Sequence, residues 1–110
     1  MARLDPKDGY AVLINTFYVA PERAGELMTL LERATQETMR FQPGYVSANL
    51  HLSSDRTRIV NYAQWRSRAD FEAMLRDPTA RAHIAEVGKV ATSFDPVIFE
   101  LRCSDPAEIS

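Results

Sequence analysis

The chain has 110 residues, of which 45% are hydrophobic and 25% charged, and its formal net charge is −2. This length and composition indicate one globular domain. The small negative charge and the lack of a Lys/Arg cluster argue against nucleic acid as a partner. No apolar run reaches the roughly 20 residues of a membrane span. The single cysteine, Cys103, excludes an internal disulfide and a cysteine-based metal site, so we expect a cytoplasmic protein.

The ends of the chain differ from its middle. We expect residues 10–102 to form the folded domain, because the hydrophobic patterns lie there. Residues 1–9 are predicted to be an N-terminal arm and residues 103–110 a flexible C-terminal tail.

The N-terminal third predicts a strand and then a long helix. Residues 10–19 are rich in β-branched and aromatic side chains, which favour a strand. A helix is expected over residues 20–44, because Pro21 suits its first turn and Pro43–Gly44 ends the pattern. Its expected packing stripe has a spacing of three and four: Ala24, Leu27, Met28, Leu31, Ala34 and Thr38.

A hairpin is predicted next. Residues 45–53 alternate, which divides them between two faces of a strand. One set is Tyr45, Ser47, Asn49 and His51, and the other is Val46, Ala48, Leu50 and Leu52. Residues 54–56 predict a turn into a third strand over residues 57–65.

Two helices and a last strand complete the pattern. Ser67 and Asp70 have the spacing of a helix N-cap. Asp77–Pro78 restarts a second short helix, whose shared face comprises Ala80, His83, Ile84, Val87 and Ala91. Residues 94–102 are predicted to be the last strand.

The expected order is therefore β-α-β-β-α(α)-β, the α+β ferredoxin-like arrangement of an antiparallel sheet with helices on one face. We expect Val60 and Tyr62 to point towards the helices. The open face is then expected to carry four large apolar residues: Leu13, Phe17, Ile59 and Trp65. Such a face is unusual on a monomer, so we expect a second copy to cover it and form a two-fold homodimer.

Asn61 and Trp65 are the most distinctive pair in the sequence. They share one face of the third strand, about 13 Å apart, and the small Ala63 leaves a notch between them. A flat ligand in this notch could form a hydrogen bond with the amide of Asn61 and pack against the indole of Trp65. The alternative is structural: Trp65 anchors the core and Asn61 bonds to a neighbour. Asn15 is a second strand amide, and the two amides would satisfy each other or a ligand.

The remaining chemistry in the sequence is sparse. His83 lies on an apolar helix face, where a packed core histidine is common, yet it is also the best base in the chain. We find no nucleotide-binding loop, zinc motif or nucleophile elbow. If the protein is an enzyme, it must use a pocket and the reactivity of its substrate.

Five stretches of the chain resemble the antibiotic biosynthesis monooxygenase family. They are VLINTFYV, QPGYVSANLHLS, VNYAQWRSRADFEAML, DPTARAHI and FDPVIFEL. The resemblance covers residues 10–101 and implies a dimeric ferredoxin-like α+β barrel. It also implies oxidation of polycyclic phenols, anthrones or quinols to quinones by O₂, with no metal, flavin or haem as cofactor. Asn61 and Trp65 match the asparagine and tryptophan that such enzymes use to contact the substrate's oxygens.

We expect further residues in the site beside the pair that matches the family. His83 is a possible base, and the substrate-binding set is Asn15, Phe17, Ala63, Phe71 and Met74. Phe71 stands where the family has a tyrosine, and the family's arginine on the later helix is unmatched, so the proton relay is expected to differ.

Two alternatives accompany this expectation. In haem-degrading oxygenases of the same superfamily, a strand asparagine and a helix histidine flank the haem, and Asn15 and His83 match those positions. The tryptophan of those enzymes falls near Met74 or Leu75 and is missing here. The second alternative is a dimer that binds a small ligand without catalysis, because fold does not fix function.

Overall fold

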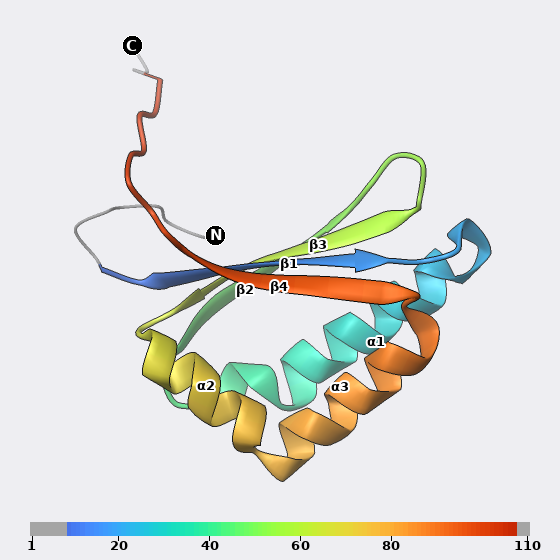
Figure 1. Cartoon of the computed structure of the whole chain (residues 1–110), viewed down its shortest axis with the longest axis horizontal. Coiled ribbons are helices and arrows are strands. Elements are labelled where there is room, and N and C mark those ends of the chain that lie inside the picture. The colour runs from blue at the N-terminus through green and yellow to red at the C-terminus, as the bar shows by residue number, and fades with distance from the viewer. Residues whose placement is uncertain (1–8, 108–110) are drawn as a thin grey trace.

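The structure is a computed structural model that describes residues 9–107. In this part of the chain, strands and α-helices follow one another in the predicted order (Figure 1). They are β1 (Ala11–Tyr18), α1 (Ala24–Glu37), β2 (Tyr45–Leu52), β3 (Arg58–Trp65), α2 (Arg68–Arg76), α3 (Pro78–Val90) and β4 (Ser93–Glu100). The predicted arm lies outside the described residues except for Gly9, as does the predicted tail beyond residue 107.

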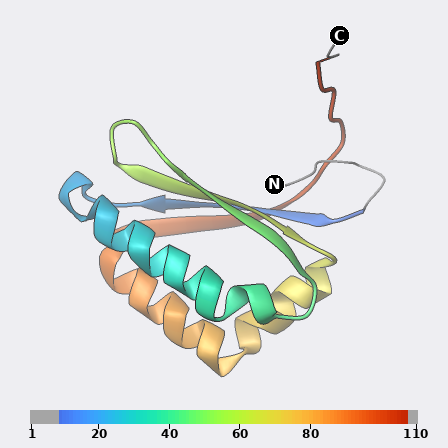
Figure 2. The same cartoon turned by 180° about the vertical axis from the view of Figure 1, so that it is seen from behind.

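The strands form one antiparallel sheet in the order β2-β3-β1-β4. The three α-helices of the described part cover the same face of this sheet, as Figures 1 and 2 show from opposite sides. The predicted α+β ferredoxin-like fold is therefore confirmed. Within residues 9–107, no helix has the length and apolar character needed to cross a membrane.

Local side-chain chemistry sets the helix boundaries. Single 3-10 turns, η2 (Pro21–Arg23) and η3 (Met39–Phe41), flank α1 and leave it shorter than predicted. Ser67 caps α2 as predicted, because its hydroxyl accepts a hydrogen bond from the backbone N–H of Asp70 at 3.1 Å. Asp77 caps α3 in the same way, with its carboxylate 2.9 Å from the N–H of Ala80.

The helices pack on the face of the sheet that was predicted to be open. Phe17 and Ile59 lie in one core cluster with buried residues of α1 and α3. Leu13 and Trp65 lie in a second cluster with buried residues of α2 and α3. The predicted orientation of these four residues was wrong. Both faces of the strands are largely apolar, and alternation tells which residues share a face but not which face the helices cover.

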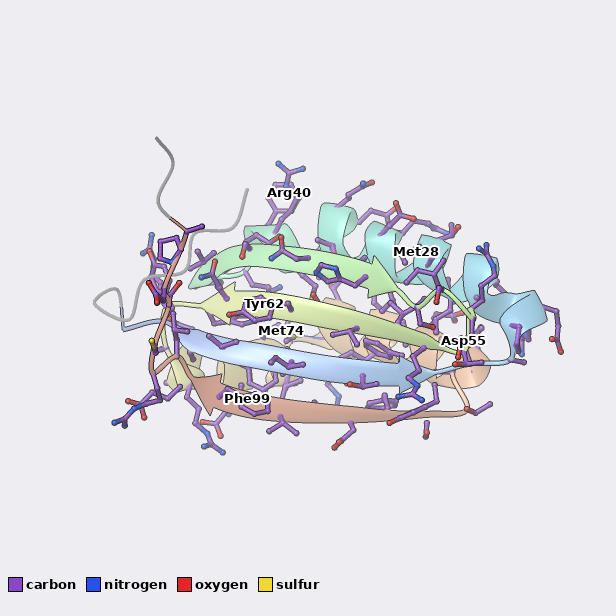
Figure 3. The ribbon with its side chains drawn as sticks, turned by 90° about the horizontal axis from the view of Figure 1, so that it is seen from above. Met28, Arg40, Asp55, Tyr62, Met74 and Phe99 are labelled. Carbon is purple, nitrogen blue, oxygen red and sulfur yellow. The ribbon has the colours of Figure 1, made fainter. Side chains whose placement is uncertain are left out.

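The open face of the sheet carries the complementary set. Val60 and Tyr62 alternate with the core residues of β3 and so point away from the helices, contrary to the prediction. Figure 3 views this face, with Tyr62 on β3 and Phe99 on β4. Tyr18, Val97 and Phe99 belong to the same face and are 40–46% exposed.

A β-bulge interrupts the start of β2. Tyr45 pairs with Trp65 and Ser47 pairs with Gln64, so Val46 is an extra residue between two successive pairs. The bulge turns Tyr45 to the helix-covered face, whereas strict alternation had placed it with Ser47. The prediction for Tyr45 was therefore wrong, and the rest of β2 follows the predicted alternation.

Gly44 brings the chain into this bulge. Its φ angle is +84°, in the left-handed region that favours glycine. Its carbonyl accepts a hydrogen bond from the N–H of Arg66 at 2.8 Å, and a Cβ at this position would overlap the side chain of Asp70. The turn predicted at Pro43–Gly44 therefore depends on glycine for both its backbone conformation and its packing.

Candidate functional site

A cavity of about 590 Å³ lies between the sheet and the helices. It is lined by every residue that the sequence predicted for the site: Asn15, Phe17, Asn61, Ala63, Trp65, Phe71, Met74 and His83. These residues come from β1, β3, α2 and α3, so the fold collects them from distant parts of the chain. The volume is within the range of small-molecule sites. The roles assigned to these residues stay predictions.

Asn15 and Asn61 are direct neighbours across the β1–β3 ladder. The Oδ1 atom of Asn61 accepts a hydrogen bond from the backbone N–H of Asn49 at 3.2 Å, which leaves the side-chain amide N–H groups of Asn61 as donors. The Oδ1 atom of Asn15 is buried and has no partner. An unpaired buried polar atom costs about 1–3 kcal/mol. Both asparagines line the cavity, and the buried Oδ1 atom of Asn15 is left without a hydrogen-bond partner next to the amide donors of Asn61.

Trp65 is enclosed by two other aromatic rings. It is 2% exposed, and the rings of Tyr45 and Phe71 meet it nearly edge-on, with centroids 5.9 Å and 6.0 Å away. Edge-to-face contacts of this kind add about 0.5–1.5 kcal/mol to the burial of the rings. The indole is thus both a core anchor and a wall of the cavity, which combines the two interpretations that the sequence left open.

His83 connects the cavity to the surface of the molecule. Its side chain is 22% exposed, and its Nε2 atom lies 4.0 Å from an Oε2 atom of Glu37 at the end of α1. A histidine in this position can take a proton from a ligand and pass it to solvent. Glu37 was not singled out from the sequence, because only the packing of α1 against α3 brings it to His83.

Tyr45 is the second residue that the sequence did not assign to the site. It lines the cavity through the bulge described above. Burial raises the pKa of its phenol above the usual value, and a backbone hydrogen bond from Ala48 and the nearby Arg40 act in the opposite direction. No sequence pattern marks a bulge, so alternation could not reveal this placement.

The composition of the wall limits what the cavity can bind. Large apolar side chains dominate it, and its polar groups are Asn15, Asn61, Tyr45, His83, Thr35, Arg68 and Glu72. This combination suits a flat, mainly carbon ligand that carries a few oxygen atoms. Among residues 9–107, no group of three or more His, Cys, Asp or Glu side chains is arranged to hold a metal ion.

Comparisons with known proteins identify the family of this chain. Residues 11–86 match the model of the family described as antibiotic biosynthesis monooxygenase. Tetracenomycin-F1 monooxygenase of Streptomyces glaucescens is 48% identical over 83 residues, which cover 76% of this chain and 74% of that protein.

Solved structures extend the likeness over most of the chain. A monooxygenase from the gene ActVA-Orf6 of Streptomyces coelicolor, crystallised with nanaomycin D, superposes with a TM-score of 0.84. It is 28% identical, and the match covers 94% of this chain and 96% of that one. SnoaB, a cofactor-independent oxygenase from Streptomyces nogalater, shares the fold with a TM-score of 0.80 and 23% identity, over 90% of this chain and 99% of that one. By its family match and its 48% identical relative, this chain belongs to the antibiotic biosynthesis monooxygenase family.

Proposed function

We propose that this protein is a monooxygenase that oxidises a flat polycyclic phenol, anthrone or quinol to a quinone with O₂, and that it needs no metal, flavin or haem. The observation that carries the proposal is the unpaired Asn15 carbonyl beside the Asn61 amide in an apolar cavity walled by Trp65. The family supports the reaction type. The relative named for tetracenomycin F1 supports a polycyclic substrate.

In the proposed mechanism the substrate supplies the electrons. Loss of a proton from an anthrone carbon gives an enolate, which passes one electron to O₂. The resulting radical and superoxide combine, and protonation gives a hydroperoxide. Loss of water then leaves a carbonyl, so a CH₂ group and O₂ become C=O and H₂O. The protein must bind the substrate, stabilise its oxyanion and exclude bulk water.

Each step has a residue suited to it. An N–H group of Asn61 is available to donate to the developing oxyanion, because the carbonyl of that side chain is already engaged by Asn49. Asn15 lines the cavity beside Asn61 and would be a second polar contact for the substrate. His83 would take the proton, since it lines the cavity and is partly exposed. Trp65, Phe71 and neighbouring apolar side chains would hold the rings.

Oxygen uptake with the anthrone dithranol tests this proposal. We expect the wild type to consume O₂ and form the quinone, and Asn61→Ala to lose at least about tenfold in rate, because one donor to an oxyanion is worth about 10²–10³ in favourable cases. Trp65→Phe should also be slower. Asn49→Ala is the matched control, because that side chain bonds to the Tyr62 carbonyl on the open face. Equal rates in all variants would remove Asn61 and Trp65 from the site.

The alternatives give different results in the same experiments. A haem-binding protein would shift the Soret band of haemin stoichiometrically, and His83→Ala would abolish the shift. Asn15 and His83 do line one cavity, which is the observation behind this alternative. A dimer that only binds ligands would be stabilised by flat polyphenols in thermal-shift measurements but would consume no O₂.

The proposal includes a homodimer in the cytoplasm. The support for the dimer is the open face of the sheet, where Tyr18, Val97 and Phe99 expose large apolar surfaces. A second copy with the same face would bury them around a two-fold axis. The support for the location is the free, exposed thiol of Cys103, which is the expected state under reducing conditions.

A further inference from the structure

Tyr45 enters the cavity only because β2 begins with a bulge. The extra residue, Val46, lets Tyr45 pair with Trp65 and share the helix-covered face with Ala48, three residues later. A bulge disrupts the ladder locally and is a common means of re-aiming a side chain near an active site. The site therefore contains a phenol that the alternating pattern of the strand would have placed outside.

The phenol ring packs against the indole of Trp65 and lines the same cavity as Ala63. Its edge contact with Trp65, at 5.9 Å, fixes the ring at one end. Ala48, which shares the helix-covered face with Tyr45, pairs directly with Ala63. The next inward-facing pair along the ladder is Leu50 with Asn61. Tyr45 therefore lines the same cavity as Asn61, together with Ala48 and Ala63, the two smallest side chains of the cavity floor.

The hydroxyl group is suited to donate rather than to titrate. A phenol O–H group can donate a hydrogen bond, and Tyr45 lines the cavity in which a ligand would lie. Burial, the largest effect on this side chain, raises its pKa. Phe71, the other ring against Trp65, has no hydroxyl, so within this aromatic cluster Tyr45 supplies the O–H group.

We propose that Tyr45 is a further substrate-contacting residue, whose hydroxyl donates a hydrogen bond to the oxyanion that forms when the substrate loses its proton. The inference rests on the proposed function, and it adds a second donor to Asn61. It also narrows the substrate class to polycycles with an ionisable oxygen that both Tyr45 and Asn61 can reach in the cavity.

The test is the acidity of a bound probe. The phenol and phenolate of 2-hydroxyanthraquinone differ in visible absorption, so the pKa of the bound dye can be read without turnover. Loss of a hydrogen bond to an anion should raise this pKa by about 1 unit, which is tenfold in the ionisation constant. We therefore expect Tyr45→Phe to raise the pKa of the bound dye relative to wild type. Other charged or titratable groups of the wall, Arg68, Glu72 and His83, are the same in both proteins.

The controls separate this inference from the proposed function. Tyr62→Phe removes a hydroxyl from the open face, where Figure 3 shows the residue, and should leave the pKa of the bound dye unchanged. Tyr45→Phe keeps the ring against Trp65, so the variant should remain folded and unfold in one cooperative thermal transition. Equal dye pKa values in wild type and Tyr45→Phe would overturn the role of Tyr45 alone. A wild type that binds no dye would overturn both proposals.

Discussion

Asn15 and Asn61 stand opposite each other on adjacent strands, yet only one of the two side-chain carbonyls is satisfied. The side-chain carbonyl of Asn61 accepts a hydrogen bond from the backbone N–H of Asn49 at 3.2 Å. The side-chain carbonyl of Asn15 is buried and has no hydrogen-bond partner. Such an arrangement lowers the stability of the empty protein. A mutation that removes the unpaired carbonyl should therefore increase the stability of the fold and weaken ligand binding.

Asn15→Leu should raise the free energy of unfolding by about 1 kcal/mol, because it replaces an unpaired buried amide with an apolar group of similar size. The same change should weaken the turnover of dithranol. Urea denaturation and oxygen uptake on one preparation measure both effects. The matched control is Asn49→Leu, which removes a 2.8 Å hydrogen bond to the Tyr62 carbonyl and should destabilise the protein. Destabilisation by Asn15→Leu of the same size would contradict the argument.

Gly44→Ala should destabilise the protein by more than about 1 kcal/mol. The residue has a φ angle of +84°, and the new methyl group would overlap Asp70, the first-turn acid of α2. Gly25→Ala is the control, because Gly25 lies in α1 with open space around its Cβ position. This substitution should raise the free energy of unfolding by about 0.5–1 kcal/mol. Thermal unfolding of both variants distinguishes them, and equal melting temperatures would refute the assignment of Gly44.

The hairpin between β2 and β3 should respond to acid through Asp55. The Thr57 hydroxyl, the Thr57 N–H and the Ser53 hydroxyl donate to its carboxylate and lower its pKa from 3.8 to about 2. Because the folded-state pKa is lower than the unfolded one, the carboxylate stabilises the protein above pH 3.8, and this contribution is lost as the pH falls through about 2.

Asp55→Asn should therefore be less stable than wild type at neutral pH, and the difference should shrink between these two pH values. Urea midpoints of both proteins across this range provide the measurement, together with an NMR titration of the wild-type carboxyl group. A difference that stays constant down to the lowest pH would show that the charge of Asp55 has no part in it.

Phe99→Lys should convert the proposed dimer into a monomer. Phe99 lies on the edge strand β4, is 46% exposed and belongs to the open apolar face. A second copy would bury a lysine at this position, and the desolvation of its charge would oppose dimerisation. Phe41→Lys is the control, since Phe41 is 72% exposed in η3, outside the sheet. Sedimentation velocity at micromolar concentration separates the two species. A wild type that sediments as a monomer would end the dimer proposal.

The sequence predicted the element order and the membership of the cavity because both depend on local periodicity. Asn15, Asn61 and Trp65 share a face by simple alternation, and His83 follows the spacing of its helix. The direction of that face was not predictable in the same way. When both faces are apolar, the choice depends on where α1 and α3 pack, which is a long-range property.

Two residues escaped prediction for related reasons. Glu37 meets His83 only through the packing of two helices that are far apart in the sequence. Tyr45 required one extra residue in β2, and the sequence from Tyr45 to Ser47 contains neither the glycine nor the proline that often marks an irregular strand. Glu37 lies beside His83, and Tyr45 lines the cavity, so each is a residue to test for a part in the proposed proton transfer.

The insertion at Val46 makes the chemistry of the pocket adjustable by a change in length alone. Deleting that single residue would send the phenol to the outside and leave the indole, the two carboxamides and the helices where they are. Homologous chains that differ by one residue at this point would thus share the same scaffold and differ in the acidity they impose on a bound polyphenol. A change in the length of β2 would then alter the side chains that line the cavity, and so the substrates it accepts, as a substitution would.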